Sequence, residues 1–142
     1  MPGRYFTVQE AEALLPQLTP ILSELQAEKR EADRLQAQLA ELSEKVGGNG
    51  HSLSEAYQQL QQQAQKISDR AARLAQQIND YGCELKDINS GLLDFRTLYQ
   101  GREVYLCWRM GEERIQWWHE LDSGFAGRKP LQRELIEGKD ES

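Results

Sequence analysis

The chain has 142 residues, with 17 Lys and Arg against 23 Asp and Glu and a net charge of −6. This length predicts one domain, or one helical arm plus one small module. The mixed, net acidic charge argues against general nucleic-acid or membrane-surface binding, which needs a concentrated basic patch. No apolar run approaches a membrane span, the first residues lack the core of a signal peptide, and two cysteines make no disulfide framework. We therefore expect a cytoplasmic protein with reduced thiols.

A first helix is predicted from about residue 8 to residue 46. Thr7 can cap its free amides while Glu10 reaches back to the Thr7 amide, which together make a capping box. The apolar residues that follow are spaced alternately three and four apart, which is typical of a coiled-coil seam. Pro16 and Pro20 each remove an amide donor, so we expect a bend or a break near them. The predicted seam consists of Ala11, Leu14, Leu18, Ile21, Leu25, Glu28, Ala32, Leu35, Leu39, Leu42 and Val46.

A second helix is predicted from about residue 53 to residue 81. The segment 47–50 ends the first helix, Ser52 and Glu55 form a second capping box, and Gly82 ends the second helix. Two heptad helices joined by a short loop should form an antiparallel hairpin. Because the first helix is longer, it extends past the second by roughly ten residues, Val8 to Gln17. The apolar stripe widens there, so we expect the C-terminal module to pack on this end.

The exposed faces of this predicted arm differ in chemistry. The first helix carries mixed charges, whereas the second is rich in glutamine between residues 58 and 65. The simpler interpretation is a solvated helix surface. The alternative is a second coiled-coil surface for dimerisation, since Ala64, Ala71, Ala72 and Ala75 would let another helix approach closely.

After Gly82 the pattern changes from helical to alternating. Residues 83–88 predict a short strand, residues 92–95 form a short apolar segment, and residues 103–109 and 114–119 predict a hairpin that turns at 110–113. A symmetric turn places His119 on the core face, and Cys107 on the opposite face. A shift of one residue in the turn would exchange the faces of one strand and could bring Cys107 and His119 together. In the symmetric register the core face comprises Val104, Leu106, Trp108, Ile115, Trp117 and His119.

The segment 122–130 contains two glycines and the adjacent cations Arg128 and Lys129. It could present amides and Arg128 to an anion, although it lacks the spacing of a Walker loop. The predicted fold is mostly α with a small β module, an α+β protein. Its parts are a helical hairpin (1–82), a tryptophan-rich β module (83–135) and a charged tail (136–142).

Several motifs resemble a known family. They include Arg4-Tyr5-Phe6-Thr7-Val8 near the start, and later Gly91-Leu92-Leu93-Asp94-Phe95, Leu106-Cys107-Trp108 and Gly124-Phe125-Ala126-Gly127-Arg128. Together these resemble the bacterial domain-of-unknown-function family 2203, over nearly the whole chain. Arg96 departs from the pattern, because the family often has proline there. The resemblance implies a bacterial, cytoplasmic, single-module protein, and it supplies no activity and no catalytic residues.

The residues with reactive or metal-binding side chains admit two interpretations. Cys83, Cys107, His119 and Asp94 are candidate metal ligands, together with Glu120 and Asp122, but none has the close spacing typical of a zinc site. The simpler interpretation is that both cysteines are buried and that His119 is a hydrogen-bonded core histidine. Nucleophilic catalysis by Cys107 is disfavoured because the residue lies in mid-strand. We therefore expect no metal and no cofactor, and we assign no catalytic residue.

The tryptophans and arginines of the β module are the usual anchors of protein interfaces. We therefore predict a non-catalytic adaptor or assembly protein. Its arm would mediate self-association or bind a partner protein, and its tryptophan-rich module would provide a recognition surface in which Trp118 points away from the core. The candidate binding residues are Asp94, Arg102, Trp108, Trp118, His119 and Arg128. The alternative is a small metal- or ligand-dependent enzyme built on Asp94, Cys107, His119 and Arg128.

Overall fold

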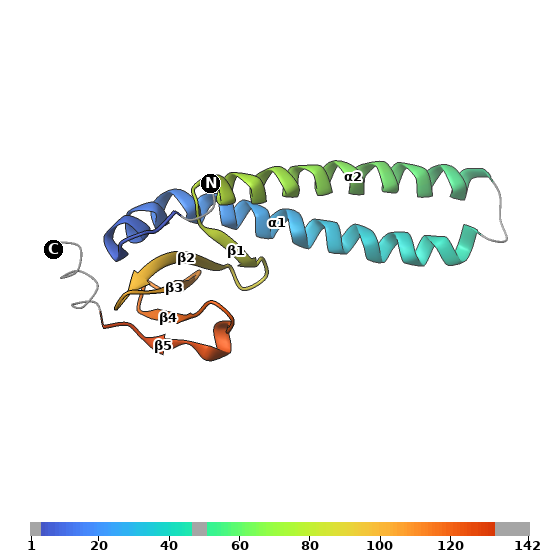
Figure 1. The fold of residues 1–142 in the computed structure, drawn as a ribbon. Coiled ribbons are helices and arrows are strands. Elements are labelled where there is room, and N and C mark those ends of the chain that lie inside the picture. Colours follow the sequence, from blue (N-terminus) through green and yellow to red (C-terminus); the bar gives the residue numbers. More distant parts are fainter. Residues whose placement is uncertain (1–3, 47–50, 133–142) are drawn as a thin grey trace.

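The computed structural model describes residues 4–46 and 51–132, and Figure 1 shows two long helices beside an antiparallel sheet. The elements are α1 (Val8–Val46), α2 (His51–Asp80), β1 (Glu84–Asp87), β2 (Leu92–Tyr99), β3 (Arg102–Arg109), β4 (Trp117–Glu120), the 3₁₀ turn η1 (Phe125–Gly127) and β5 (Lys129–Pro130). The predicted α+β class is confirmed. The loop at 47–50, the side chain of Ser52 and the predicted tail lie outside the described part.

The start of α1 follows directly from its sequence. The Glu10 amide donates to Thr7 Oγ1 at 3.0 Å, and the Thr7 amide donates to Glu10 Oε1 at 2.9 Å, so the capping box is confirmed. The two prolines do not break the helix, although Figure 1 shows its direction changing between the first turns and the rest. The Thr19 hydroxyl donates to the Leu15 carbonyl at 2.7 Å, an interaction that bends helices.

Helices α1 and α2 lie side by side and run in opposite directions (Figure 1). Glu28, the charged residue in the predicted seam, pairs with Arg70 of α2 at 3.3 Å. Counting ten residues along each helix from this pair places Asp80, the last residue of α2, level with Leu18. The first turns of α1 therefore extend past the end of α2. Neither helix of the described part is both long enough and apolar enough to cross a bilayer.

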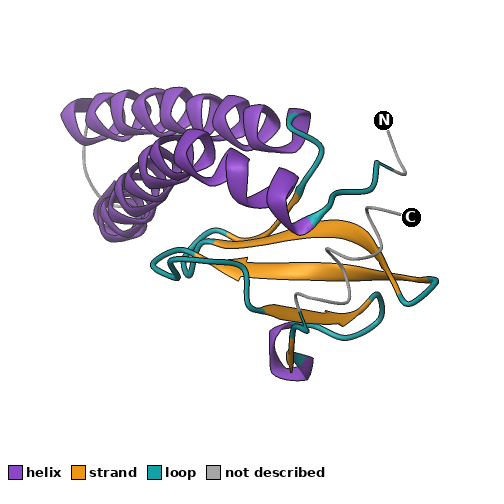
Figure 2. Cartoon of the chain, turned by 90° about the vertical axis from the view of Figure 1, so that its left-hand side faces the viewer, coloured by secondary structure: helices purple, strands orange, loops and turns teal. Residues whose placement is uncertain are grey.

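The first turns of α1 lie over one face of the sheet, as Figure 2 shows. The Phe6 ring meets Phe95 edge to face, with centroids 5.3 Å apart, and the Phe6 amide donates to the Arg96 carbonyl at 2.7 Å. Helix and sheet thus share one core. Its buried members include Val8, Ala11, Leu15, Leu18 and Leu22 from α1, and Leu93, Phe95, Val104, Leu106, Trp108, Ile115 and Trp118 from the rest.

The sheet has the order β1-β2-β3-β4-β5, and neighbouring strands are antiparallel. Across β3 and β4 the partners are Tyr105 with His119, Leu106 with Trp118, and Cys107 with Trp117. The symmetric turn expected from the sequence is therefore wrong, and the faces of β4 are exchanged. The physical reason is a contact with α1: the Ile115 amide donates to Glu12 Oε2 at 2.8 Å, and regular pairing with β3 begins only at Trp117.

This register changes where the tryptophans lie. Trp118 faces α1 and is 7% exposed, and its ring lies 5.0 Å from that of Tyr99. The expectation that Trp118 points away from the core is therefore wrong. Trp117, its neighbour in the chain, lies on the opposite face and is half-buried, because successive strand residues alternate between faces.

Candidate functional site

The sheet face turned away from α1, here called the outer face, carries a cluster of polar residues of the β module. Asp94 of β2 pairs with Cys107 of β3, and Cys107 pairs in turn with Trp117 of β4. His119 shares this face because it follows Trp117 by two residues. Three adjacent strands therefore place Asp94, Cys107 and His119 together, which is the outcome that a one-residue shift in the hairpin makes possible.

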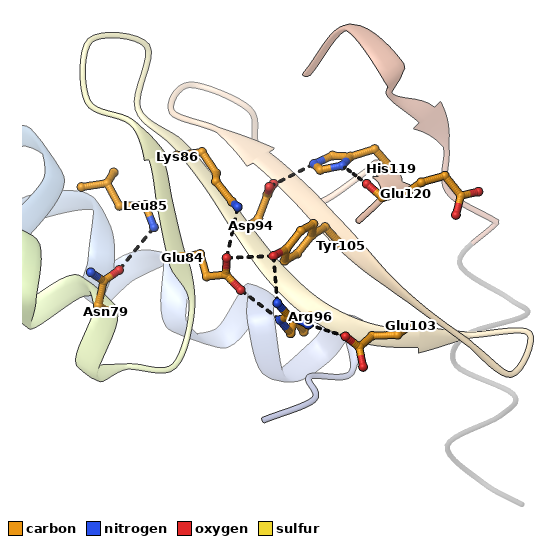
Figure 3. A network of polar contacts seen from close by, with 10 residues as sticks. All are labelled: Asn79, Glu84, Leu85, Lys86, Asp94, Arg96, Glu103, Tyr105, His119 and Glu120. Atoms are coloured by element: carbon orange, nitrogen blue, oxygen red, sulfur yellow. Dashed lines mark hydrogen bonds and ion pairs between the residues drawn. The ribbon is translucent and has the colours of Figure 1, made fainter. Parts of the chain in front are cut away.

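Asp94 and His119 form a buried pair, with Asp94 Oδ2 and His119 Nε2 3.0 Å apart and both side chains 2% exposed. On the other side of the ring, Nδ1 lies 2.8 Å from the Glu120 carbonyl oxygen (Figure 3). A carbonyl oxygen only accepts, so Nδ1 carries a proton and donates it there. Nε2 then faces the carboxylate, and the contact is favourable only if a further proton or a cation lies between the two atoms.

Arg128 packs against Cys107. Its Nε donates to Cys107 Sγ at 3.3 Å, and it pairs with both carboxylate oxygens of Glu112 at 2.8 Å. The guanidinium carbon lies 4.4 Å from the ring centre of Phe125 and 5.4 Å from that of Trp117. Arg128 is thus a fixed part of the cluster, paired with an acid, which disfavours the anion-binding interpretation of its loop.

The candidate ligand atoms of Asp94, Cys107 and His119 lie within 4.8 Å of one another. The three residues are 0–1% exposed. The buried oxygen Asp94 Oδ1 accepts no hydrogen bond of ordinary geometry, although the Cys107 thiol lies beside the carboxylate. A buried acceptor without a hydrogen-bond donor is unfavourable, so burying this oxygen costs folding free energy.

Burial governs the protonation of these groups. It raises the pKa of the Cys107 thiol to about 12, against the opposing hydrogen bond from Arg128. Burial also raises the pKa of the Asp94 carboxyl, against the opposing effect of His119. Cys107 is therefore a neutral thiol at physiological pH, and a thiol is a poor nucleophile. Direct nucleophilic catalysis by Cys107 stays disfavoured.

A polar network continues from the cluster along the outer face (Figure 3). The Tyr105 ring lies 5.3 Å from that of His119, and its hydroxyl donates to Glu84 Oε1 at 2.8 Å. Arg96 donates to Glu84 Oε2 at 3.0 Å and to the Tyr105 hydroxyl at 3.2 Å, and it also pairs with Glu103. Tyr105 shares the outer face with Cys107 because the two residues are two positions apart in β3. Glu84 and Arg96 could be added only by knowing how the strands pair.

The six predicted binding residues do not form one surface. Asp94, His119 and Arg128 meet around Cys107 on the outer face, whereas Trp108 and Trp118 belong to the core on the other side. Arg102, at the start of β3, pairs with Glu120 through two contacts of 2.8 and 3.0 Å. The structure therefore brings together the four residues named for the enzyme alternative, Asp94, Cys107, His119 and Arg128.

A separate feature lies on the arm, far along α1 and α2 from the sheet. A groove runs between the two helices, and all of its lining residues belong to them, including Leu39, Ala40, Tyr57 and Ala64. The seam here is incompletely covered, since Leu42, Tyr57 and Leu60 are only half-buried. Near the sheet, by contrast, Leu25 and Ile78 are fully buried. The far half of the arm therefore has apolar surface that the hairpin does not cover.

One of the comparisons with known proteins found a match. The family described as "Uncharacterized conserved protein (DUF2203)" matches residues 4–131, nearly the whole of the described chain. The resemblance inferred from the motifs is thereby confirmed. No curated protein and no solved structure matches the chain.

Proposed function

Because this chain belongs to the uncharacterised conserved family DUF2203, we propose a function from the structure itself. The protein is a non-catalytic association protein whose helical arm is a coiled coil that binds the arm of a second copy. The β module anchors the arm and provides a surface for recognising a further protein partner. We place this activity in the cytoplasm, where thiols such as Cys107 stay reduced.

The proposal is carried by the groove on the far half of the arm. Its half-buried seam residues gain stability when another helix covers them, because burial of apolar surface is favourable. The stretch 57–65 of α2 carries no charged side chain, although the chain as a whole has a net charge of −6. A neutral surface lets two such acidic chains approach without strong repulsion. Glutamine amides both donate and accept, so a glutamine-rich face is complementary to its own copy.

Sedimentation equilibrium of the full chain tests the association. Replacing two groove residues, Gln61→Glu and Gln65→Glu, places four like charges at the interface of a dimer, so the dimer should dissociate. A matched pair, Gln59→Glu and Gln63→Glu, adds the same charges to α2 at positions that do not line the groove. We expect this control pair to remain dimeric. A monomeric wild type, or equal dissociation by both pairs, would contradict the proposal.

For partner recognition we propose the outer-face surface around Phe125 and Trp117 rather than Trp118. Phe125 is 41% exposed, and Arg109 and Arg128 both lie over its ring at 5.3 and 4.4 Å. Aromatic and arginine side chains in such a cluster are typical anchors of a protein interface. Loss of partner capture in Phe125→Ala, with unchanged oligomeric state, would separate this role from that of the arm.

The second candidate is a metal- or ligand-dependent activity of the β module. It is supported by one specific observation, the convergence of Asp94, Cys107, His119 and Arg128.

A further inference from the structure

We propose that Asp94, Cys107 and His119 form a binding site for one divalent transition-metal ion, and that Zn²⁺ fits their donor atoms best. The site lies on the outer face of the sheet, so the inference does not depend on association through the arm. It differs from the expectation drawn from the sequence, which found no ligand spacing typical of a metal site. The ligands come from three different strands, and spacing along the chain therefore does not reveal them.

The chemistry of the donors selects the class of metal. A thiolate sulfur, an imidazole nitrogen and a carboxylate oxygen are the ligands that Zn²⁺ uses in proteins. Mg²⁺ and Ca²⁺ prefer oxygen ligands alone, so a set containing Cys107 and His119 disfavours them. Three protein ligands also leave the fourth tetrahedral position open to water or another small ligand, as in catalytic rather than structural zinc sites.

The distances are close to those of a filled site. With bond lengths of about 2.0–2.3 Å, ligand atoms around a tetrahedral zinc ion lie roughly 3.3–3.7 Å apart. The candidate atoms here all lie within 4.8 Å of one another, and Asp94 Oδ2 is 3.0 Å from His119 Nε2. Asp94 and Cys107 project from paired positions of β2 and β3, and His119 projects from β4 opposite Tyr105, two residues from Cys107. We infer that side-chain rotations bring the three atoms onto one ion.

Two of the three ligands already have the outer contacts that metal sites use. His119 Nδ1 donates to the Glu120 carbonyl at 2.8 Å, which directs the Nε2 lone pair toward Asp94 and Cys107. Arg128 Nε donates to Cys107 Sγ at 3.3 Å and is itself held by Glu112. A cation beside the sulfur stabilises the thiolate form that binds a metal.

A metal ion would also relieve two unfavourable features of the three-residue cluster. It would take the place of the proton that must otherwise lie between Asp94 Oδ2 and His119 Nε2, and it would accept an electron pair from each atom. It would also compensate the buried carboxylate, whose Oδ1 accepts no hydrogen bond of ordinary geometry. On binding, the Cys107 S–H bond breaks and the proton held between Asp94 Oδ2 and His119 Nε2 is displaced. Both protons pass to solvent, and the sulfur electron pair forms the metal–sulfur bond. One thiolate, one carboxylate and one divalent cation then leave the inner ligand set neutral.

The competing explanation is that Asp94 and His119 form only a structural pair. The substitution Asp94→Asn distinguishes a structural pair from a metal site, because an asparagine amide can donate to His119 Nε2 and keep the hydrogen bond. A structural pair would survive this change with its geometry intact. A metal site would not, since an amide is a far weaker ligand than a carboxylate for Zn²⁺.

The test is a titration of the untagged, chelator-treated full chain with Co²⁺, followed by displacement with Zn²⁺. We expect a sulfur-to-cobalt charge-transfer band that saturates at one equivalent and disappears as Zn²⁺ is added. Cys107→Ser should remove the band, and Asp94→Asn and His119→Gln should weaken Co²⁺ binding by about 100-fold or more, since even outer contacts contribute about 10–100-fold. Cys83→Ser is the matched control, because Cys83 is also buried but lies outside the cluster.

Three outcomes would overturn the site: no band in the wild type, a band that persists in Cys107→Ser, or a band lost in Cys83→Ser. Circular dichroism reports whether each variant folds. If Cys107→Ser does not fold, Asp94→Asn decides, because it preserves size and hydrogen bonding. Wild-type affinity in folded Asp94→Asn would equally overturn the proposal.

Discussion

At the scale of single residues, the β module contains groups whose placement does not serve stability. Asp94 is a buried carboxylate with one oxygen that accepts no ordinary hydrogen bond, and Cys107 is a buried thiol held by an arginine. Removing a carboxylate from water is unfavourable unless its charge is fully compensated. Buried ionisable groups of this kind are found most often at functional sites.

Asp94→Asn should therefore stabilise the metal-free protein. The amide removes the buried charge and still donates to His119, so we expect the free energy of unfolding to rise by about 1 kcal/mol. Urea denaturation in the presence of a chelator measures this. A loss of stability of similar size would mean that the charge pair with His119 supports the fold.

Glu112 should make the stability depend on pH. Burial alone would raise its pKa, but the hydrogen bonds from Arg128 and from the Arg109 amide outweigh it, so the pKa of Glu112 is lowered on folding. The resulting stabilisation is present above the unfolded pKa of about 4.3 and is lost as the pH falls toward the folded pKa. Urea denaturation between neutral and acid pH should show a smaller acid-induced loss in Glu112→Gln than in the wild type. An equal loss of unfolding free energy with falling pH in the wild type and in Glu112→Gln would contradict this role.

At the scale of elements, the register of β4 decides which side chains meet. Since Trp118 faces the core and Trp117 the outer face, Trp118→Ala should reduce the free energy of unfolding by about 3–5 kcal/mol. Trp117→Ala should cost about 1 kcal/mol, because the ring is only half-buried. Chemical denaturation of the two variants checks this. A larger loss of stability in Trp117→Ala than in Trp118→Ala would instead indicate the symmetric register, in which His119 and Cys107 lie on opposite faces.

Local signals predicted the helices well, and a long-range contact explains the main error. The capping box at Thr7 and Glu10 depends on neighbours in the chain, so the sequence was enough to place it. The start of β4 depends on Glu12, whose carboxylate binds the Ile115 amide across 103 positions of sequence. No local pattern contains that contact, and the meeting of Cys107 with His119 follows from it. The candidate residues could therefore be predicted from the sequence, but their proximity in the sheet could not.

At the scale of the whole molecule, the arm and the outer face are separate. Figure 1 shows the arm extending well beyond the sheet, and the groove is lined by α1 and α2 alone. We therefore expect the pair Gln61→Glu and Gln65→Glu to dissociate the dimer without changing Co²⁺ affinity. Asp94→Asn should weaken Co²⁺ binding by about 100-fold or more without changing the oligomeric state. Sedimentation and cobalt titration of both variants measure the two effects, and a change in both properties in either variant would show that the sites are coupled.

Three strands of one sheet would assemble the proposed metal site from Asp94, Cys107 and His119. X-ray absorption at the zinc edge of the Zn²⁺-loaded full chain tests this site, because the spectrum counts the atoms bound to the ion. We expect one sulfur at about 2.3 Å, with the remaining nitrogen and oxygen atoms at about 2.0–2.2 Å. A first shell without sulfur, or with two sulfurs, would contradict it.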